Sequence, residues 1–197
     1  MKPTIGIIIR YEKEKYYVKK ELIETFLNKN VNIIGIFNFE KELIDKCNGI
    51  ILPGGDDIKL EDLETIKYLY QKNIPVLGIC LGMQEMGYFF NGEMNKISNY
   101  NHLKPNEKYV HEIKINKKSK LYKIIKKDII KVNSRHKDYL IKTDLDISSV
   151  SDVIESIEDK NKKFFIGVQW HPESMINYDI NSNLLIDEFI KECKNNI

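Results

Sequence analysis

The chain of 197 residues contains 42% hydrophobic and 30% charged residues, which is typical of a soluble globular protein. This length suits a central sheet covered by helices, and we predict a single domain over residues 1–197. The formal net charge is only +2, so no basic face is indicated and nucleic-acid binding has no support in the composition.

The first half of the chain alternates apolar strands with helices. Apolar, β-branched runs predict strands that lie at residues 4–9, 31–37, 49–52 and 75–79. Apolar residues near helical spacing predict helices that lie at residues 17–28, 39–47 and 60–70, and a helix-forming segment follows the fourth strand. Such alternation predicts a parallel sheet with right-handed crossovers.

The second half has a different pattern, with strands predicted at residues 109–115, 129–132, 153–157 and 164–170. The last two flank a turn-rich segment and predict an antiparallel hairpin. The pattern leaves the type of the short element at 121–125 open, and a helix through Cys193 closes the chain. Together the elements predict an α/β fold with a mostly parallel central sheet, helices on both faces and an antiparallel extension in the C-terminal half.

The cysteines and the N-terminus indicate the compartment. Cys47, Cys80 and Cys193 are few, odd in number and without metal-ligand spacing, which argues against a disulfide framework and favours a reducing compartment. The apolar run at residues 5–9 is far too short for a signal peptide or a membrane span. We therefore expect a cytoplasmic protein with no membrane partner, in which Cys47 and Cys193 are packing thiols.

The stretch from Asn73 to Met86 predicts a nucleophile at Cys80. A buried strand stops at Gly78-Ile79-Cys80-Leu81-Gly82, and a helix-forming segment follows at once. A nucleophile between strand and helix, flanked by glycines, follows the logic of the nucleophile elbow, whose sharp turn strains the backbone and leaves little room for neighbouring side chains. The positive end of the helix favours a thiolate. A buried structural cysteine is the alternative, and it would be favoured for an isolated cysteine.

A second segment follows the third predicted strand, at the edge where parallel sheets bind ligands. The consecutive glycines of Pro53-Gly54-Gly55-Asp56 allow backbone N–H groups to face a ligand. The N–H groups of Gly55 and Leu81 would then supply the two donors of an oxyanion hole. A plain turn is the alternative, and it would be favoured for this segment taken alone.

A third segment, Gly167-Val168-Gln169-Trp170-His171-Pro172-Glu173, lies at the end of the last predicted strand. In an extended chain His171 and Glu173 share one side, and we expect Pro172 to keep the segment extended. A thiolate nucleophile needs a base that later protonates the leaving amine, and a third group that orients this base. We assign these roles to Cys80, His171 and Glu173.

In this order and spacing, the three motifs resemble the class I glutamine amidotransferase superfamily, and the similarity covers nearly the whole chain. The resemblance implies a flavodoxin-like α/β fold, a Cys-His-Glu triad and a γ-glutamyl thioester that is hydrolysed by water. Gly55 and Leu81 match the oxyanion-hole positions of the superfamily. Gln84 matches a position that helps to hold the glutamyl end of the substrate.

Two branches of the superfamily compete as interpretations. γ-Glutamyl hydrolase-like peptidases, including hydrolases of γ-glutamyl-γ-aminobutyrate, release a free amine, whereas glutaminase subunits pass ammonia to a synthetase. Residues 132–136 resemble the Asn-Ser-x-His segment of the hydrolase branch, so that Ser134 and His136 become candidate substrate-binding residues. Residues 151–157 also resemble that branch.

The chain departs from the hydrolase pattern in three places. Leu81 stands where those hydrolases commonly carry Arg, and it matches the ammonia-supplying branch instead. Lys137-Asp138 stands where His-Gln is usual, and the segment between Asp57 and Leu60 lacks the longer insertion of many hydrolases. These departures concern the substrate more than the chemistry.

The remaining histidines have simpler interpretations. His136 has two that stay open, a role in proton transfer and a role in closing a loop over the site. We expect His102 and His111 to be surface or strand residues, and the lysines within residues 117–127 to form a solvated face.

Our leading hypothesis is a cytoplasmic hydrolase of a small-molecule γ-glutamyl substrate that needs no metal and no cofactor. The second hypothesis is a glutaminase component that works only with a synthetase partner. The third is a binding or regulatory protein that keeps only the fold. The amine side of the scissile bond has no motif from which it can be predicted.

Overall fold

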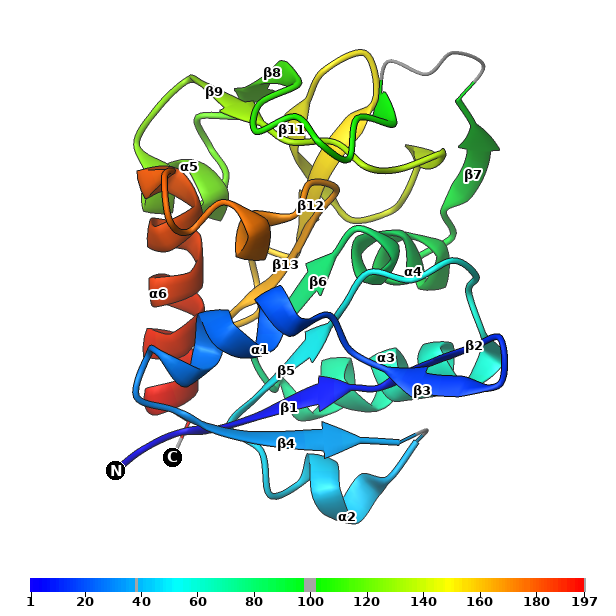
Figure 1. Cartoon of the computed structure of the whole chain (residues 1–197), viewed down its shortest axis with the longest axis vertical. Coiled ribbons are helices and arrows are strands. Elements are labelled where there is room, and N and C mark those ends of the chain that lie inside the picture. Colours follow the sequence, from blue (N-terminus) through cyan, green and yellow to red (C-terminus); the bar gives the residue numbers. More distant parts are fainter. Residues whose placement is uncertain (38, 98–101, 197) are drawn as a thin grey trace.

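A computed structural model of the chain describes residues 1–37, 39–97 and 102–196 (Figure 1). Within these residues, a nine-stranded sheet has the strand order β4-β1-β5-β6-β13-β12-β11-β8-β9. The neighbours from β4 to β13 pair in parallel, and those from β13 to β9 pair antiparallel. The predicted fold class, a mixed α/β sheet with a parallel part and an antiparallel extension, is therefore confirmed.

The elements alternate along the chain as expected for this fold. The strands of the large sheet are β1 (Thr4–Ile8), β4 (Asn32–Ile36), β5 (Gly49–Leu52), β6 (Val76–Ile79), β8 (His111–Ile115), β9 (Ile129–Val132), β11 (Asp146–Val150), β12 (Ile154–Glu158) and β13 (Phe165–Val168). Two further ribbons pair β2 (Arg10–Glu12) with β3 (Lys15–Tyr17) and β7 (Glu93–Lys96) with β10 (Asp138–Lys142). The helices are α1 (Lys20–Leu27), α2 (Lys41–Ile44), α3 (Leu60–Lys72), α4 (Leu81–Phe89), α5 (Lys120–Ile125), α6 (Ile180–Lys194) and the 3-10 helix η2 (Pro172–Ser174).

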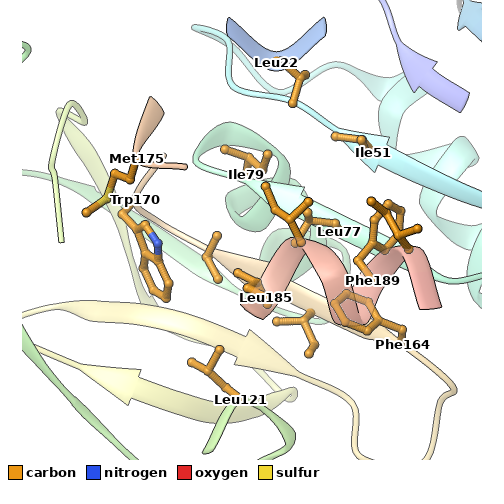
Figure 2. Packing of buried hydrophobic residues seen from close by; sticks show 14 of the residues in the cluster. Leu22, Ile51, Leu77, Ile79, Leu121, Phe164, Trp170, Met175, Leu185 and Phe189 are labelled. Atoms are coloured by element: carbon orange, nitrogen blue, oxygen red, sulfur yellow. The ribbon is translucent and has the colours of Figure 1, made fainter. Parts of the chain in front are cut away.

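One face of the sheet is covered by α1, α5 and α6. Figure 2 shows Leu77 of β6 among the side chains of this core, with Leu185 and Phe189 projecting from α6. Leu22 of α1 and Leu121 of α5 belong to the same buried cluster. Burial of each such side chain stabilises the fold by roughly 1.5–3 kcal/mol, so this face supplies much of the hydrophobic driving force.

The other face is covered by α2, α3 and α4. Strand residues alternate between the two faces, so Ile51 contributes to the first core whereas Ile50 and Leu52 contribute to the second. Ile66 of α3 and Met86 of α4 pack in this second core. Because both faces are covered, the parallel strands read as continuous apolar runs in the sequence, as predicted.

The structure differs from the prediction mainly in short elements. The predicted helix at 17–28 begins only at Lys20, because Tyr17 pairs with Arg10 in the β2–β3 hairpin. Strands β7, β10 and β11 were not predicted, because they are short and none of them is a continuous apolar run. The hairpin of β12 and β13 is confirmed, and the open element at 121–125 is a helix.

None of the described helices combines the length and the apolar content that are required to cross a lipid bilayer.

Candidate active site

Cys80 lies between β6 and α4, where the chain turns sharply from strand to helix. Its backbone torsions are φ 53° and ψ −104°, a region that residues with a side chain rarely adopt. The flanking glycines are required by close contacts. A Cβ on Gly82 would lie 2.0 Å from the carbonyl oxygen of Leu52, and one on Gly78 would lie 2.5 Å from Met86 Sδ. The strand–nucleophile–helix geometry predicted from the glycine spacing is therefore present.

The positive φ at Cys80 has a measurable cost. A Cys80→Gly variant should be more stable to urea than Cys80→Ala by about 1 kcal/mol, because glycine adopts this region without strain while alanine keeps the steric penalty. Both variants lack the thiol, so the comparison isolates the backbone. Equal unfolding midpoints, or a more stable alanine variant, would contradict strain at this position.

His171 follows β13 and is held against Cys80. Its Nδ1 lies 2.7 Å from Glu173 Oε1, and all three side chains are buried. A Cβ on Gly54 would lie 3.0 Å from His171 Cε1 and 3.7 Å from Cys80 Cβ, which shows that both residues lie beside the same glycine. The structure therefore brings the predicted thiol, imidazole and carboxylate together at the carboxyl end of the parallel strands.

The backbone between His171 and Glu173 is not extended, contrary to our expectation. Pro172 begins the 3-10 helix η2, because a proline lacks an N–H and its fixed φ suits the first position of a helix. The carboxylate reaches the imidazole from this tight turn. The expected contact is present, but the local geometry that produces it is different.

Asn133 fixes the main chain of His171 and was not predicted as a site residue. Its Oδ1 accepts from the backbone N–H of His171 at 2.8 Å, and its Nδ2 donates to the carbonyl oxygen of His171 at 2.9 Å. A buried amide with both ends bonded to one residue fixes that residue's position. The only sequence signal for this contact is the Asn-Ser-x-His segment itself.

The electrostatics of the buried pair favour an imidazolium. Burial lowers the pKa of His171, but the Glu173 carboxylate and the Cys80 sulfur outweigh this effect and raise the pKa to about 9. Burial likewise raises the pKa of Glu173, and the charge and hydrogen bond of His171 reverse this effect and bring it below the usual value. A protonated His171 can stabilise a thiolate and can give a proton to a leaving group.

The raised pKa predicts how stability depends on pH. Since the folded state holds the His171 proton more tightly than the unfolded chain, this contribution is complete below about pH 6.5 and is lost as the pH rises through about 9. The free energy of unfolding should therefore fall by about 3 kcal/mol more in the wild type than in His171→Gln between pH 6 and pH 9. Urea titrations at both pH values measure the difference. Parallel pH profiles for the two proteins would contradict the shift.

The predicted oxyanion-hole residues lie next to each other. A Cβ on Gly55 would lie 2.8 Å from Leu81 Cδ2. Leu81 is the first residue of α4, and the first N–H groups of a helix have no acceptor within it. The segment around Gly55 is fixed from outside, because Asp56 N–H donates to Glu12 Oε1 at 2.7 Å and Pro53 O accepts from Arg10 Nε at 3.1 Å.

Arg10 anchors this segment and was missed by the sequence analysis. Its guanidinium donates to both oxygens of Glu85 at 2.7 and 2.9 Å and lies 3.2 Å from Asp62. Burial raises the pKa of Glu85, and the charge of Arg10 opposes the rise. Residue 10 lies between the predicted strand at 4–9 and the predicted helix at 17–28, and nothing in the sequence indicated that Arg10 is buried against Glu85 of α4.

Two glutamines connect the thiol to the start of β10. Gln169 Nε2 donates to Cys80 Sγ at 3.5 Å, and Gln84 Nε2 donates to Gln169 Oε1 at 3.1 Å and to the carbonyl oxygen of Asp138 at 2.8 Å. Gln84 was predicted as a residue that holds the glutamyl end of the substrate, and that role stays a prediction. Gln169 belongs to the segment at residues 167–173 that contains His171 and Glu173, but the sequence analysis gave it no role.

Ser134 and His136 lie in the loop after β9. The Ser134 hydroxyl donates to the carbonyl oxygen of His102 at 2.8 Å, and His136 Nδ1 lies 3.0 Å from the carbonyl oxygen of Asp138. Both side chains are buried, and burial lowers the pKa of His136 to about 4. These contacts are to neighbouring loops, and a role of either residue in substrate binding stays a prediction.

The expectation for His102 is wrong. We expected a surface or strand residue, but His102 lies outside the strands and is only 2% exposed. It is buried because its ring packs against those of His111 and His136. His111 lies in β8, as expected. Ring nitrogens of His102 and His111 and a carboxylate oxygen of Glu155 lie within 4.8 Å of one another, so these residues could hold a metal ion.

Comparisons with known proteins agree with this geometry. The profile of the family described as "Glutamine amidotransferase class-I" matches residues 13–191. A Schizosaccharomyces pombe protein, provisionally named a glutamine amidotransferase, is 36% identical over 180 residues, which cover 75% of this chain and 70% of that protein. One of the subunits of the glutamine-hydrolyzing GMP synthase of Methanococcus aeolicus is 30% identical over 153 residues, which cover 75% of each chain.

The fold also resembles a solved structure. The glutaminase domain of Trypanosoma brucei CTPS, with bound acivicin, superposes with a TM-score of 0.73 over 98% of this chain and 94% of that chain. At 19% identity this likeness concerns the fold alone. The motifs, the fold and the family match over most of the sequence agree, and the chain belongs to the glutamine amidotransferase class-I family.

Proposed function

We propose that this protein hydrolyses a γ-glutamyl amide bond through a γ-glutamyl thioester on Cys80. The observation that supports this most directly is the buried contact of His171 with Glu173, together with the position of His171 and Cys80 beside Gly54. The proposed reaction needs a nucleophile, a base and a group that orients the base, and these three side chains would supply them. The high pKa of His171 favours a thiolate–imidazolium pair, the reactive form of such a site.

The proposed reaction has two steps. The Cys80 thiolate attacks the γ-carbonyl carbon, and the carbonyl π electrons move to oxygen, where the N–H groups of Gly55 and Leu81 stabilise the charge. The C–N bond then breaks, and the amine departs with a proton from His171. The γ-glutamyl group remains bound to Cys80 as a thioester. Water attacks the thioester carbon and gives a proton to His171, and glutamate departs as the C–S bond breaks.

In the first candidate function, the isolated chain hydrolyses a γ-glutamyl conjugate and releases a free amine. It is supported by Asn133, which comes from the segment that resembles the hydrolase branch and is bonded to the main chain of His171. A groove of about 310 Å³ between the β2–β3 hairpin and the start of α3 offers space for an amine. Arg10 and Glu12 line this groove and lie beside Gly55.

In the second candidate function, the chain is a glutaminase subunit that passes ammonia to a synthetase. The similarity to the Methanococcus GMP synthase subunit, over three quarters of each chain, favours it. Leu81, where the hydrolase branch commonly carries Arg, favours it as well. The two candidates share the thioester chemistry and differ in what leaves as the amine and in whether a partner is needed.

A single screen can separate the candidates. Glutamine and a panel of γ-glutamyl amines would be incubated with wild type and with Cys80→Ala, each alone and with synthetases encoded near the gene, and glutamate release would be followed by mass spectrometry. Release from a γ-glutamyl amine by the isolated wild type favours the first candidate. Release from glutamine only in the presence of a synthetase favours the second. Equal release by Cys80→Ala in every arm would overturn the shared chemistry.

A further inference from the structure

Beyond the thiol site, a cluster of histidines lies in the antiparallel part of the sheet, near β8 and β12. Figure 1 shows these two strands. His102 precedes β8, His111 begins β8, Glu155 lies in β12, and His136 lies in the loop after β9. The ring of His102 is 4.7 Å from that of His111 and 4.8 Å from that of His136, measured between centroids. The sequence separates these residues widely, so no metal-binding spacing was visible in it.

Two buried atoms in this cluster lack a partner. Among the described residues, Glu155 Oε2 and His136 Nε2 are both fully buried and make no hydrogen bond. Glu155 is 1% exposed and His136 is 4% exposed. A buried acceptor without a partner costs free energy. Two such atoms in one cluster indicate that a positively charged group could bind there.

The hydrogen bonds of His136 and His102 indicate which ring nitrogens could bind an ion. His136 Nδ1 contacts the carbonyl oxygen of Asp138 at 3.0 Å, which makes Nδ1 the protonated nitrogen and Nε2 an acceptor. His102 Nε2 contacts the Asp152 carboxylate at 2.8 Å, which leaves its Nδ1 as an acceptor, 3.4 Å from the Ser134 hydroxyl and 3.8 Å from Glu155 Oε1. A carbonyl or carboxylate behind the imidazole, as in these two residues, orients histidine ligands toward zinc. His111 Nε2 contacts Glu155 Oε1 at 2.7 Å, and an ion would take the place of the proton between them.

We propose that His102, His111 and Glu155 form a binding site for a divalent transition-metal ion of the zinc type. His136, whose ring packs against that of His102, lies outside this group and would have to move toward the ion to become a fourth ligand. Imidazole nitrogens and a carboxylate oxygen are ligands that zinc accepts in a tetrahedral site. Ligand atoms around zinc are separated by roughly 3.3 Å. The Glu155 Oε1 atom lies 2.7 Å from His111 Nε2 and 3.8 Å from His102 Nδ1, so modest side-chain rotation would accommodate the ion.

This site has an entrance and a connection to the thiol. The His111 side chain is 19% exposed, which gives an ion access from solvent. The carbonyl oxygen of Asp138 contacts both His136 and Gln84, and Gln84 leads through Gln169 to Cys80. With His136 drawn in as the fourth ligand the site would have no open position, as is typical of a structural zinc site. The ion would then fix the loop after β9 and would not enter the proposed hydrolysis.

The test uses the Cys80→Ala protein, because the Cys80–His171 pair could itself bind zinc. After treatment with a chelator and its removal, titration with zinc chloride by calorimetry should give one equivalent per chain with a Kd at or below about 1 µM. The melting temperature should rise with zinc concentration, as mass action requires. Absence of saturable binding would overturn the proposal.

Further substitutions in the Cys80→Ala background distinguish the metal ligands from residues that only lie near the site. His111→Ala, at a partly exposed position that tolerates truncation, should weaken zinc binding by more than about 100-fold. Asp152→Asn, whose side chain is 66% exposed, should weaken it by about 10–100-fold as an outer partner of His102. Glu112→Gln, the matched control at an exposed carboxylate in β8, should leave the affinity unchanged. Equal affinities in His111→Ala and Glu112→Gln would mean that zinc binds elsewhere.

Discussion

Replacement of Cys80 by alanine should lower kcat for γ-glutamyl amide hydrolysis on the order of 10⁵–10⁶-fold, because loss of a covalent nucleophile removes the whole thioester pathway. The substrate that the screen identifies serves as the assay. A glutamine-like alkylating electrophile should also label the wild type once, at Cys80, with the adduct located by peptide mass spectrometry. The variant should fold, because alanine keeps Cβ and removes only the sulfur, which accepts a hydrogen bond from Gln169.

Cys47→Ala is the matched control for this prediction. Cys47 is also buried, but it packs in the second core, where its Sγ donates to the carbonyl oxygen of Leu43 of α2 at 3.2 Å. Burial raises the pKa of its thiol to about 11. It should remain unlabelled at neutral pH, and its variant should keep nearly full activity at some cost in stability. Activity that survives Cys80→Ala but is lost in Cys47→Ala would refute the proposed nucleophile.

Replacement of Arg10 by methionine should lower the free energy of unfolding by about 3–5 kcal/mol, since it leaves the buried carboxylate of Glu85 without its bidentate partner. The same change removes the donors to Pro53 O, so the segment that carries Gly55 should lose its support. Urea unfolding at neutral pH measures the first effect. A lower kcat in the hydrolysis assay would report the second.

A double-mutant cycle tests whether the loss comes from this contact. Arg10→Met combined with Glu85→Gln should cost less than the sum of the single changes by at least about 1.5 kcal/mol, because the neutral amide no longer needs a cation. Lys15→Met, in the same hairpin but exposed, should change stability by less than about 0.5 kcal/mol. Additive single effects would mean that Arg10 acts through packing of its carbon chain alone.

The sequence predicted those parts of the molecule that repeat a pattern or need a special residue. Strand β5 was predicted at its observed bounds, because a continuous apolar run is the signature of a strand covered on both faces. The turn at Cys80 was predictable because only glycine fits at Gly82, against the carbonyl oxygen of Leu52. Local rules determine both features, so a single sequence is enough to find them.

The parts that were missed depend on long-range contacts. Arg10 reaches Glu85 across 75 positions, and His102 reaches Asp152 across 50, so neither pairing leaves a local pattern. The η2 turn was missed for a different reason. Our rule for proline considered the residue before it and neglected its preference for the first turn of a helix.

The two bonds from Asn133 to residue 171 involve only the main chain of that residue. Any amino acid other than proline at position 171 would offer the same N–H and C=O groups, so the docking of this loop is independent of the imidazole. Position 171 is therefore a suitable place for directed evolution, since a saturation library would present every side chain except that of proline on a backbone that the rest of the molecule already holds in place.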